Sequence, residues 1–120
     1  MFKAIIILTA ISFLAVASGD VSAAGTEFLN VEAGQRLSGV VEFQISNESG
    51  AETAEVLFIA PSRCCGWATS ADCPSAEGPC TVSFDMRWLP RSGRYTVEPV
   101  VWTRGEFVLF GEEISVQVRK

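Results

Sequence analysis

Alternating apolar and polar residues dominate the chain after its first 24 positions. The clearest example is the stretch Cys80–Trp88, in which every second residue is large and apolar. These residues are Val82, Phe84, Met86 and Trp88. On an extended strand they share one face, while their polar neighbours share the other. Such a face needs a second apolar layer, so the pattern predicts an all-β, two-layer antiparallel β-sandwich with Trp88 deep in its core.

Further strands are predicted by the same criterion, and no helical period is sustained beyond the N-terminal segment. The predicted strands cover residues 26–31, 40–46, 54–60, 80–88, 95–102, 106–110 and 114–118. The consecutive apolar residues Val56–Ile59 indicate a strand covered on both faces. Pro99 cannot donate a backbone hydrogen bond, so we expect a bulge or an unpaired edge at that position.

A β-hairpin is predicted where Arg104-Gly105 separates two apolar strands. In a two-residue hairpin Trp102 would lie opposite Phe107, and Val100 opposite Leu109. The alternation that continues from Tyr95 makes Val101 the core residue and leaves Trp102 outward. We therefore expect an exposed apolar surface with Arg104 at its tip. The alternative is that the Cys-rich loop or the first strand covers this surface.

The N-terminal segment resembles an export signal. A basic start, an apolar run from Ala4 to Ala17 and small residues thereafter are typical of a secretory signal peptide, which predicts cleavage after Ala24 or, alternatively, after Ala17. The run is shorter than the roughly 20 residues that span a bilayer. We expect residues 1–24 to be removed and residues 25–120 to form one secreted or periplasmic domain, with no membrane attachment. The net charge of −5 argues against a nucleic-acid partner.

Four cysteines, Cys64, Cys65, Cys73 and Cys80, lie in the exported part. In an oxidising compartment an even, clustered count predicts two disulfides, here stapling a Cys-rich loop at residues 63–80. A zinc site is disfavoured because paired Cys-x-x-Cys motifs are missing. A vicinal disulfide is strained, so we expect Cys64 and Cys65 to bond forward to Cys73 and Cys80. A short helix at residues 68–72 is weakly indicated.

Strand and turn patterns along residues 26–119 resemble the bacterial immunoglobulin-like domains of surface and secreted proteins. The segments that carry the resemblance are 34–39 with its following strand, 54–58, 84–88, 92–96 and 114–118. The resemblance implies an immunoglobulin-like antiparallel β-sandwich. It bears on the fold more than on the function. The stapled loop departs from the family, as does the hairpin after Trp102, which lacks the family's typical Asp.

Catalysis is not expected. The chain has no His, its cysteines are predicted to be oxidised, and adjacent Glu112 and Glu113 would face opposite sides of a strand. No cofactor or metal is predicted. Asn47-x-Ser49 matches an N-glycosylation acceptor, which matters only for a eukaryotic source.

The expected function is a small secreted binding or adhesion module that recognises a protein or glycan surface through the hairpin at 100–110 and the Cys-rich loop. The predicted contact residues are Trp67, Trp102, Arg104, Phe107, Leu109 and Arg63. Trp67 either plugs the loop against the 56–59 run or serves as an exposed anchor. The alternative function is a secreted inhibitor or structural protein whose stapled loop docks into a partner's cleft, with Arg63 as the specificity residue. The sequence leaves the oligomeric state open.

Overall fold

A computed structural model describes residues 25–74 and 78–120; the predicted signal peptide lies outside them. Within these ranges the chain is all-β, as predicted, with one short 3₁₀ turn. The strands are β1 (Arg36–Ser38), β2 (Val40–Ile45), β3 (Thr53–Ile59), β4 (Gly66–Asp72), β5 (Cys80–Asp85), β6 (Gly93–Thr103), β7 (Phe107–Phe110) and β8 (Ile114–Arg119), and the turn is η3 (Met86–Trp88). No helix in the described part is long and apolar enough to cross a membrane.

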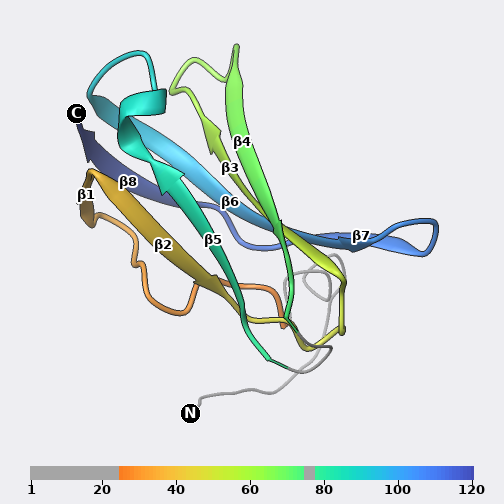
Figure 1. Ribbon diagram of the computed structural model, residues 1–120. Helices are drawn as coiled ribbons and strands as arrows, with labels where there is room; N and C mark the ends of the chain where they lie inside the picture. Colours follow the sequence, from red (N-terminus) through yellow and green to blue (C-terminus); the bar gives the residue numbers. More distant parts are fainter. Residues whose placement is uncertain (1–24, 75–77) are drawn as a thin grey trace, which may run out of the picture.

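The strands form two sheets. The larger sheet has the order β1-β8-β6-β3-β4, with β7 also paired to β6, and the smaller sheet consists of β2 and β5. Pairing is antiparallel except between β1 and β8. Figure 1 shows the β2–β5 pair lying across one face of the larger sheet, while the hairpin of β6 and β7 projects away from the body of the domain.

One hydrophobic core lies between the two sheets. Strand β5 contributes Val82 and Phe84, and β3 contributes Val56 and Phe58, all at most 1 % exposed. The Phe58 ring lies 4.5 Å from that of Phe84. Because alternate residues of both sheets enter this core, the period of two in the sequence correctly located most of it.

Trp88 is the main exception, since it is 57 % exposed and not a core residue. Strand β5 ends at Asp85, whose carboxylate accepts hydrogen bonds from the backbone and side chain of Arg87. These bonds turn the chain into η3, as a side chain that caps a turn does. They also lower the pKa of Asp85 below its ordinary value. Met86 remains buried, but Trp88 is rotated to the surface.

The predicted strand at residues 26–31 is wrong as well. Its backbone makes only an isolated bridge between Phe28 and Ile45 and a few further hydrogen bonds alongside β2. The amide side chain of Asn30 donates to the Glu42 carbonyl oxygen and accepts from the Gln44 N–H. A side chain therefore occupies backbone groups that a regular ladder would have used.

The Cys-rich segment is not one long loop. Seven of its residues form β4, which pairs with β3 from Thr53↔Asp72 to Ile59↔Gly66. The short helix considered for residues 68–72 is therefore wrong. The small polar residues of β4 show no apolar–polar alternation that would predict a strand. The strand forms because β3 offers an unpaired edge. The second face of β3 is not covered by this segment, and Leu57 and Ile59 are half-buried there.

The break predicted at Pro99 occurs on one side of β6. The register with β3 runs unbroken through Val56↔Pro99. On the other side the partner changes from β8, at Val97↔Ile114, to β7, at Val100↔Phe110. The Gly111 N–H donates to the Pro99 carbonyl oxygen at 2.8 Å. The missing Pro99 donor thus coincides with the change of strand.

Candidate ligand-binding cleft and hairpin surface

The cysteines form the disulfides Cys64–Cys65 and Cys73–Cys80. Oxidation of all four was predicted, but the expected forward pairing is wrong. Strand β4 separates Cys65 from Cys73, and at about 3.3 Å per residue its seven residues span about 20 Å. A disulfide needs Cα atoms closer than about 7 Å. Cys73 instead meets Cys80 at the start of β5, with their Cα atoms 4.8 Å apart.

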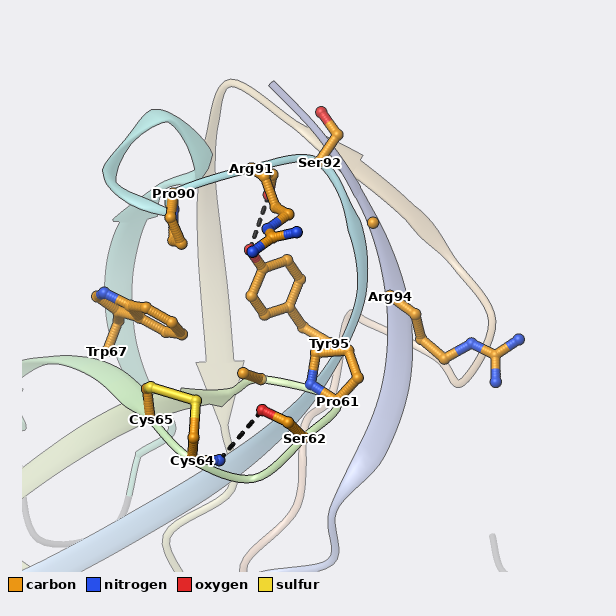
Figure 2. A pocket seen from close by; sticks show the side chains of 12 residues that line it. Pro61, Ser62, Cys64, Cys65, Trp67, Pro90, Arg91, Ser92, Arg94 and Tyr95 are labelled. Atoms are coloured by element: carbon orange, nitrogen blue, oxygen red, sulfur yellow. Dashed lines mark hydrogen bonds between the residues drawn. A yellow bond between two sulfur atoms is a disulfide. The ribbon is translucent and has the colours of Figure 1, made fainter.

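An open cleft of about 400 Å³ lies beside the Cys64–Cys65 disulfide. One wall comes from the segment before β4, and the other from the turn that leads into β6 (Figure 2). The lining residues are Ala60, Pro61, Ser62, Cys64, Cys65, Trp67, Pro90, Arg91, Ser92, Gly93, Arg94 and Tyr95. Its volume is within the range of small-molecule sites.

Two aromatic residues give the cleft a fixed apolar floor. The rings of Trp67 and Tyr95 are 6.1 Å apart in a T-shaped arrangement. Trp67 is half-buried and packs against the core, whereas Tyr95 is only 3 % exposed. The Tyr95 hydroxyl donates to the Arg91 carbonyl oxygen at 2.7 Å. One part of Trp67 thus packs inward while another lines the cleft, and its role as an anchor for a ligand stays a prediction.

The cleft is locally cationic in an acidic protein. Its lining includes Arg91 and Arg94 and no carboxylate. The ion pairs found among the described residues are Arg63–Glu113 and Arg87–Asp85, so neither lining arginine takes part in one. Figure 2 shows Arg94 extending away from the disulfide, whereas Arg91 lies at the end of the Tyr95 ring. Arg91 is therefore the cation available to a ligand in the cleft.

The hairpin has a different register from the predicted one. Its turn contains three residues, 104–106, because Thr103 pairs with Phe107 and Trp102 with Val108. Gly105 adopts the left-handed φ of 78° that this turn needs. The shift of one residue reverses the faces of β7, as a slip in a strand must. Phe107 and the following Leu109 consequently pack against the core rather than outward.

The outward face of the hairpin is apolar nonetheless. Val108 and Phe110 are 54 % and 53 % exposed. Trp102 is half-buried beside them, and Arg104 is exposed at the tip. Val101 is fully buried, as expected from the alternation. We call Trp102, Val108 and Phe110 the hairpin patch.

Two carboxylates lie on this same outer face of the larger sheet. Glu55 pairs across the strands with Val100, two residues from Trp102, and Glu98 is the next outward residue along β6. Partial burial raises the pKa of Glu55. Partial burial also raises the pKa of Glu98, with a smaller contribution from the negative charge of Glu113. The hairpin patch therefore has an acidic border.

The predicted contact residues Trp67, Trp102 and Phe107 do not share one surface. Trp67 pairs with Phe58, which lies opposite Val97 on β6. Trp102 lies five residues beyond Val97, about 17 Å further along β6, and faces the other side of the sheet from Trp67. Of the predicted contact residues, Trp67 lines the cleft and Trp102 and Arg104 lie on the hairpin, whereas Phe107 and Leu109 pack against the core.

Arg63 lies outside the cleft. Its backbone has a left-handed φ of 60°, and its guanidinium contacts the Glu113 carboxylate at 3.1 Å.

Asn47 is 4 % exposed, with its amide hydrogen-bonded to the backbone of Ala51. A glycosylation acceptor has to be free, and this side chain is engaged in its own turn.

Sequence reasoning missed Tyr95, Pro90 and Arg91 as cleft residues, and Val108 and Phe110 as patch residues. Arg91 and Tyr95 are four residues apart across a turn, a spacing that could have pointed to the hydrogen bond between them. Within residues 25–74 and 78–120 no group of three His, Cys, Asp or Glu residues could hold a metal ion. The cleft has the volume of a ligand site. Its arginines would make poor general bases because they stay protonated.

Comparison with protein-family models found no match, and comparisons with curated proteins and with solved structures found none either.

Proposed function

We propose that the chain is a secreted, non-catalytic binding module with an immunoglobulin-like fold, which docks a partner protein through the hairpin patch. The observation that carries this proposal is the exposure of Val108 and Phe110, each more than half exposed, beside Trp102. The patch sits on a hairpin that projects from the domain (Figure 1). Exposed apolar clusters of this kind mark interaction sites, and tryptophan is enriched among binding hot spots.

The immunoglobulin-like fold is supported by two features. The order β8-β6-β3-β4, with β2 and β5 in the other sheet, parallels the G-F-C-C′ and B–E arrangement of that fold. The hydrogen bond from Tyr95 to the Arg91 carbonyl oxygen has the form of a tyrosine corner. The Cys73–Cys80 bond differs from the inter-sheet disulfide of antibody domains. Two disulfides suggest a non-reducing compartment, in keeping with secretion.

The chemistry of the partner follows from the border of the patch. Glu55 and Glu98 flank the apolar residues on the sheet, while in the hairpin turn the charge of Glu106 is offset by that of Arg104. Such a border attracts a partner that presents apolar side chains among lysines and arginines. A second copy of this chain would place like charges opposite each other, which disfavours self-association through this face. We therefore propose a basic protein surface as the partner.

The proposal can be tested by photo-crosslinking. A photoreactive amino acid is placed at Val108 or, as the matched control, at the exposed Gln117 of β8, and the protein is mixed with the envelope and secreted proteins of its source. The proposal predicts one saturable adduct from position 108 that weakens as salt rises and is competed by unlabelled wild type but not by Val108→Glu. Equal adducts from both positions would refute the proposed surface.

The alternative, an inhibitor loop centred on Arg63, has less support. A segment that enters a partner's cleft as an extended strand needs β-region backbone, whereas Arg63 is left-handed. Its guanidinium is also paired with Glu113. Inhibition of an arginine-specific protease that disappears in Arg63→Ala would favour this alternative over the proposal.

A further inference from the structure

The cleft beside Cys64–Cys65 is separate from the hairpin patch and has the properties of a second binding site. It lies at the other end of β6, where Tyr95 rather than Trp102 faces it. Its volume of about 400 Å³ exceeds what a few water molecules need and suits a ligand of one or two rings. A ligand in the cleft would therefore bind independently of the hairpin patch.

The walls of the cleft offer flat, apolar surfaces. Figure 2 shows Trp67, Tyr95, Pro61, Pro90 and the sulfur atoms of the Cys64–Cys65 disulfide arranged around the opening. The disulfide is exposed there, so its sulfur atoms are available to a ligand. Aromatic faces carry partial negative charge and attract the slightly positive edges of a stacked ring. The cleft thus fits a ring that has an apolar face made of C–H groups.

The polar groups of the cleft are few and specific. The Ser62 hydroxyl oxygen accepts a hydrogen bond from the Cys64 N–H at 3.4 Å, which leaves its own hydrogen free to be donated. Arg91 supplies a guanidinium outside any ion pair among the described residues. Planar guanidinium binds a carboxylate through two parallel hydrogen bonds. One such cation and one free hydroxyl donor fit a ring that bears hydroxyl groups and a single carboxylate.

Arg91 is also held in place before any ligand arrives. Its carbonyl oxygen accepts the Tyr95 hydroxyl at 2.7 Å, and Tyr95 itself is anchored in the core. A backbone fixed in this way loses less freedom on binding, which favours affinity. A phosphate group fits less well, because no helix N-terminus lies among the lining residues and Arg94, the second lining arginine, extends away from the disulfide (Figure 2).

We propose that this cleft binds a carboxylated sugar residue. The sugar ring stacks on Trp67 and on the disulfide, and the carboxylate of the sugar pairs with Arg91. The openness of the cleft allows the residue to be part of a longer glycan. An aromatic residue with a free peptide carboxylate is the competing ligand, and it would use Arg91 without needing the Ser62 hydroxyl.

The test measures binding of two probes, trigalacturonic acid and sialyllactose, and of their methyl esters, which keep the shape and remove the charge. Binding is followed by calorimetry and by backbone amide shifts. We expect at least one acid to bind saturably and its ester at least tenfold more weakly. Arg91→Ala should weaken that acid at least tenfold, whereas Arg91→Lys, which keeps the charge but not the paired hydrogen bonds, should lose less. The matched control Arg104→Ala, at the hairpin tip, should bind as wild type does.

Several results would overturn the assignment. These are no saturable binding of either acid, equal binding of acid and ester, or an unchanged affinity in an Arg91→Ala protein that unfolds like wild type. Tighter binding of a peptide ending in phenylalanine than of both acids would replace the sugar by the peptide. Val108→Glu should leave acid binding intact, so the cleft and the hairpin patch can each fail without the other.

Discussion

The hydroxyl group of Tyr95 donates a 2.7 Å hydrogen bond to the carbonyl oxygen of Arg91, four residues earlier in the chain. The Tyr95 ring is anchored in the core, where it lies 6.1 Å from the Phe58 ring. One residue therefore joins the packing between the sheets to the turn that carries the cleft cation. The stability of the domain and the shape of the cleft are coupled through this bond.

Removing the Tyr95 hydroxyl should measurably change both the stability of the domain and the turn that shapes the cleft. Tyr95→Phe keeps the ring and its packing but loses the hydrogen bond, so we expect the free energy of unfolding to fall by about 1 kcal/mol. The turn at Pro90–Gly93 should exchange its amide hydrogens faster. Urea unfolding and hydrogen exchange measure the two effects, and a Tyr95→Phe protein as stable and as protected as wild type would contradict the coupling.

The two disulfides should differ strongly in their contribution to stability. Cys73–Cys80 closes a short loop and buries Cys80 fully, so the Cys73→Ala, Cys80→Ala protein should lose about 2.5 kcal/mol by the loop-entropy relation. Cys64–Cys65 joins neighbours and constrains almost nothing in the unfolded chain. Its double alanine variant is the matched control, and urea unfolding should show a loss below about 1 kcal/mol. A larger loss there than for Cys73–Cys80 would contradict this difference.

Gly111 should tolerate no side chain. A Cβ atom at this position would overlap the carbonyl oxygen of Thr26 and lie 2.7 Å from the Pro99 side chain. We expect Gly111→Ala to lower the free energy of unfolding by about 2 kcal/mol or more, as overpacking does. Gly66→Ala is the control, because a Cβ atom there would lie 3.2 Å from the flexible end of Leu57 and 3.3 Å from the Phe58 carbonyl oxygen, both longer than the contacts at Gly111. Thermal or urea unfolding should show a clearly smaller loss for Gly66→Ala, and equal losses would refute the close packing around Gly111.

Glu98 should make stability depend on pH in a defined direction. Burial raises its pKa, so the folded state binds this proton more tightly than the unfolded state does. The ionised group then destabilises the fold, and its cost appears as pH rises through the ordinary glutamate pKa toward the raised value. Glu98→Gln should therefore stabilise the domain at pH 7, by only a fraction of a kcal/mol because the group is partly exposed.

The gain should shrink as pH falls and vanish below about pH 3, where glutamate is neutral in both states. Glu42→Gln, at an exposed position of β2, controls for the general loss of one negative charge. Urea unfolding across this pH range is the measurement. A gain that grows on acidification, or an equal gain in Glu42→Gln, would show that burial of Glu98 is not the cause.

The alternation of apolar residues predicted the core well wherever a strand continues. Val82, Phe84 and Val101 are buried as expected. It failed at Trp88 because the carboxylate of Asp85 binds the Arg87 backbone and ends the strand, and such a local bond leaves no mark on the hydrophobic period. Strand β4 was missed for the opposite reason, since its pairing with β3 is set by tertiary structure and not by its own residues.

The two surfaces were predictable to different degrees. The outward position of Trp102 followed from its neighbour Val101, but one additional residue in the turn moved Phe107 and Leu109 inward. The cleft could not be predicted, because it needs Trp67 and Tyr95 to meet from strands that are paired only through β3. The Cys64–Cys65 bond could not be predicted either, because the length of β4 excludes forward pairing and the sequence pattern did not show that strand.

The central claim is that the hairpin patch serves binding and not folding, and neighbouring residues on β6 test it most directly. Val101→Ala should cost about 2 kcal/mol of stability, as expected for truncating a buried valine. Trp102→Ala should cost less than about 1.5 kcal/mol, yet weaken binding of the partner captured at position 108 by about 2 kcal/mol, roughly 30-fold. Urea unfolding and a binding titration on both variants provide the measurement. A Trp102→Ala protein that unfolds, or that is folded and binds the partner as tightly as wild type, would contradict the claim.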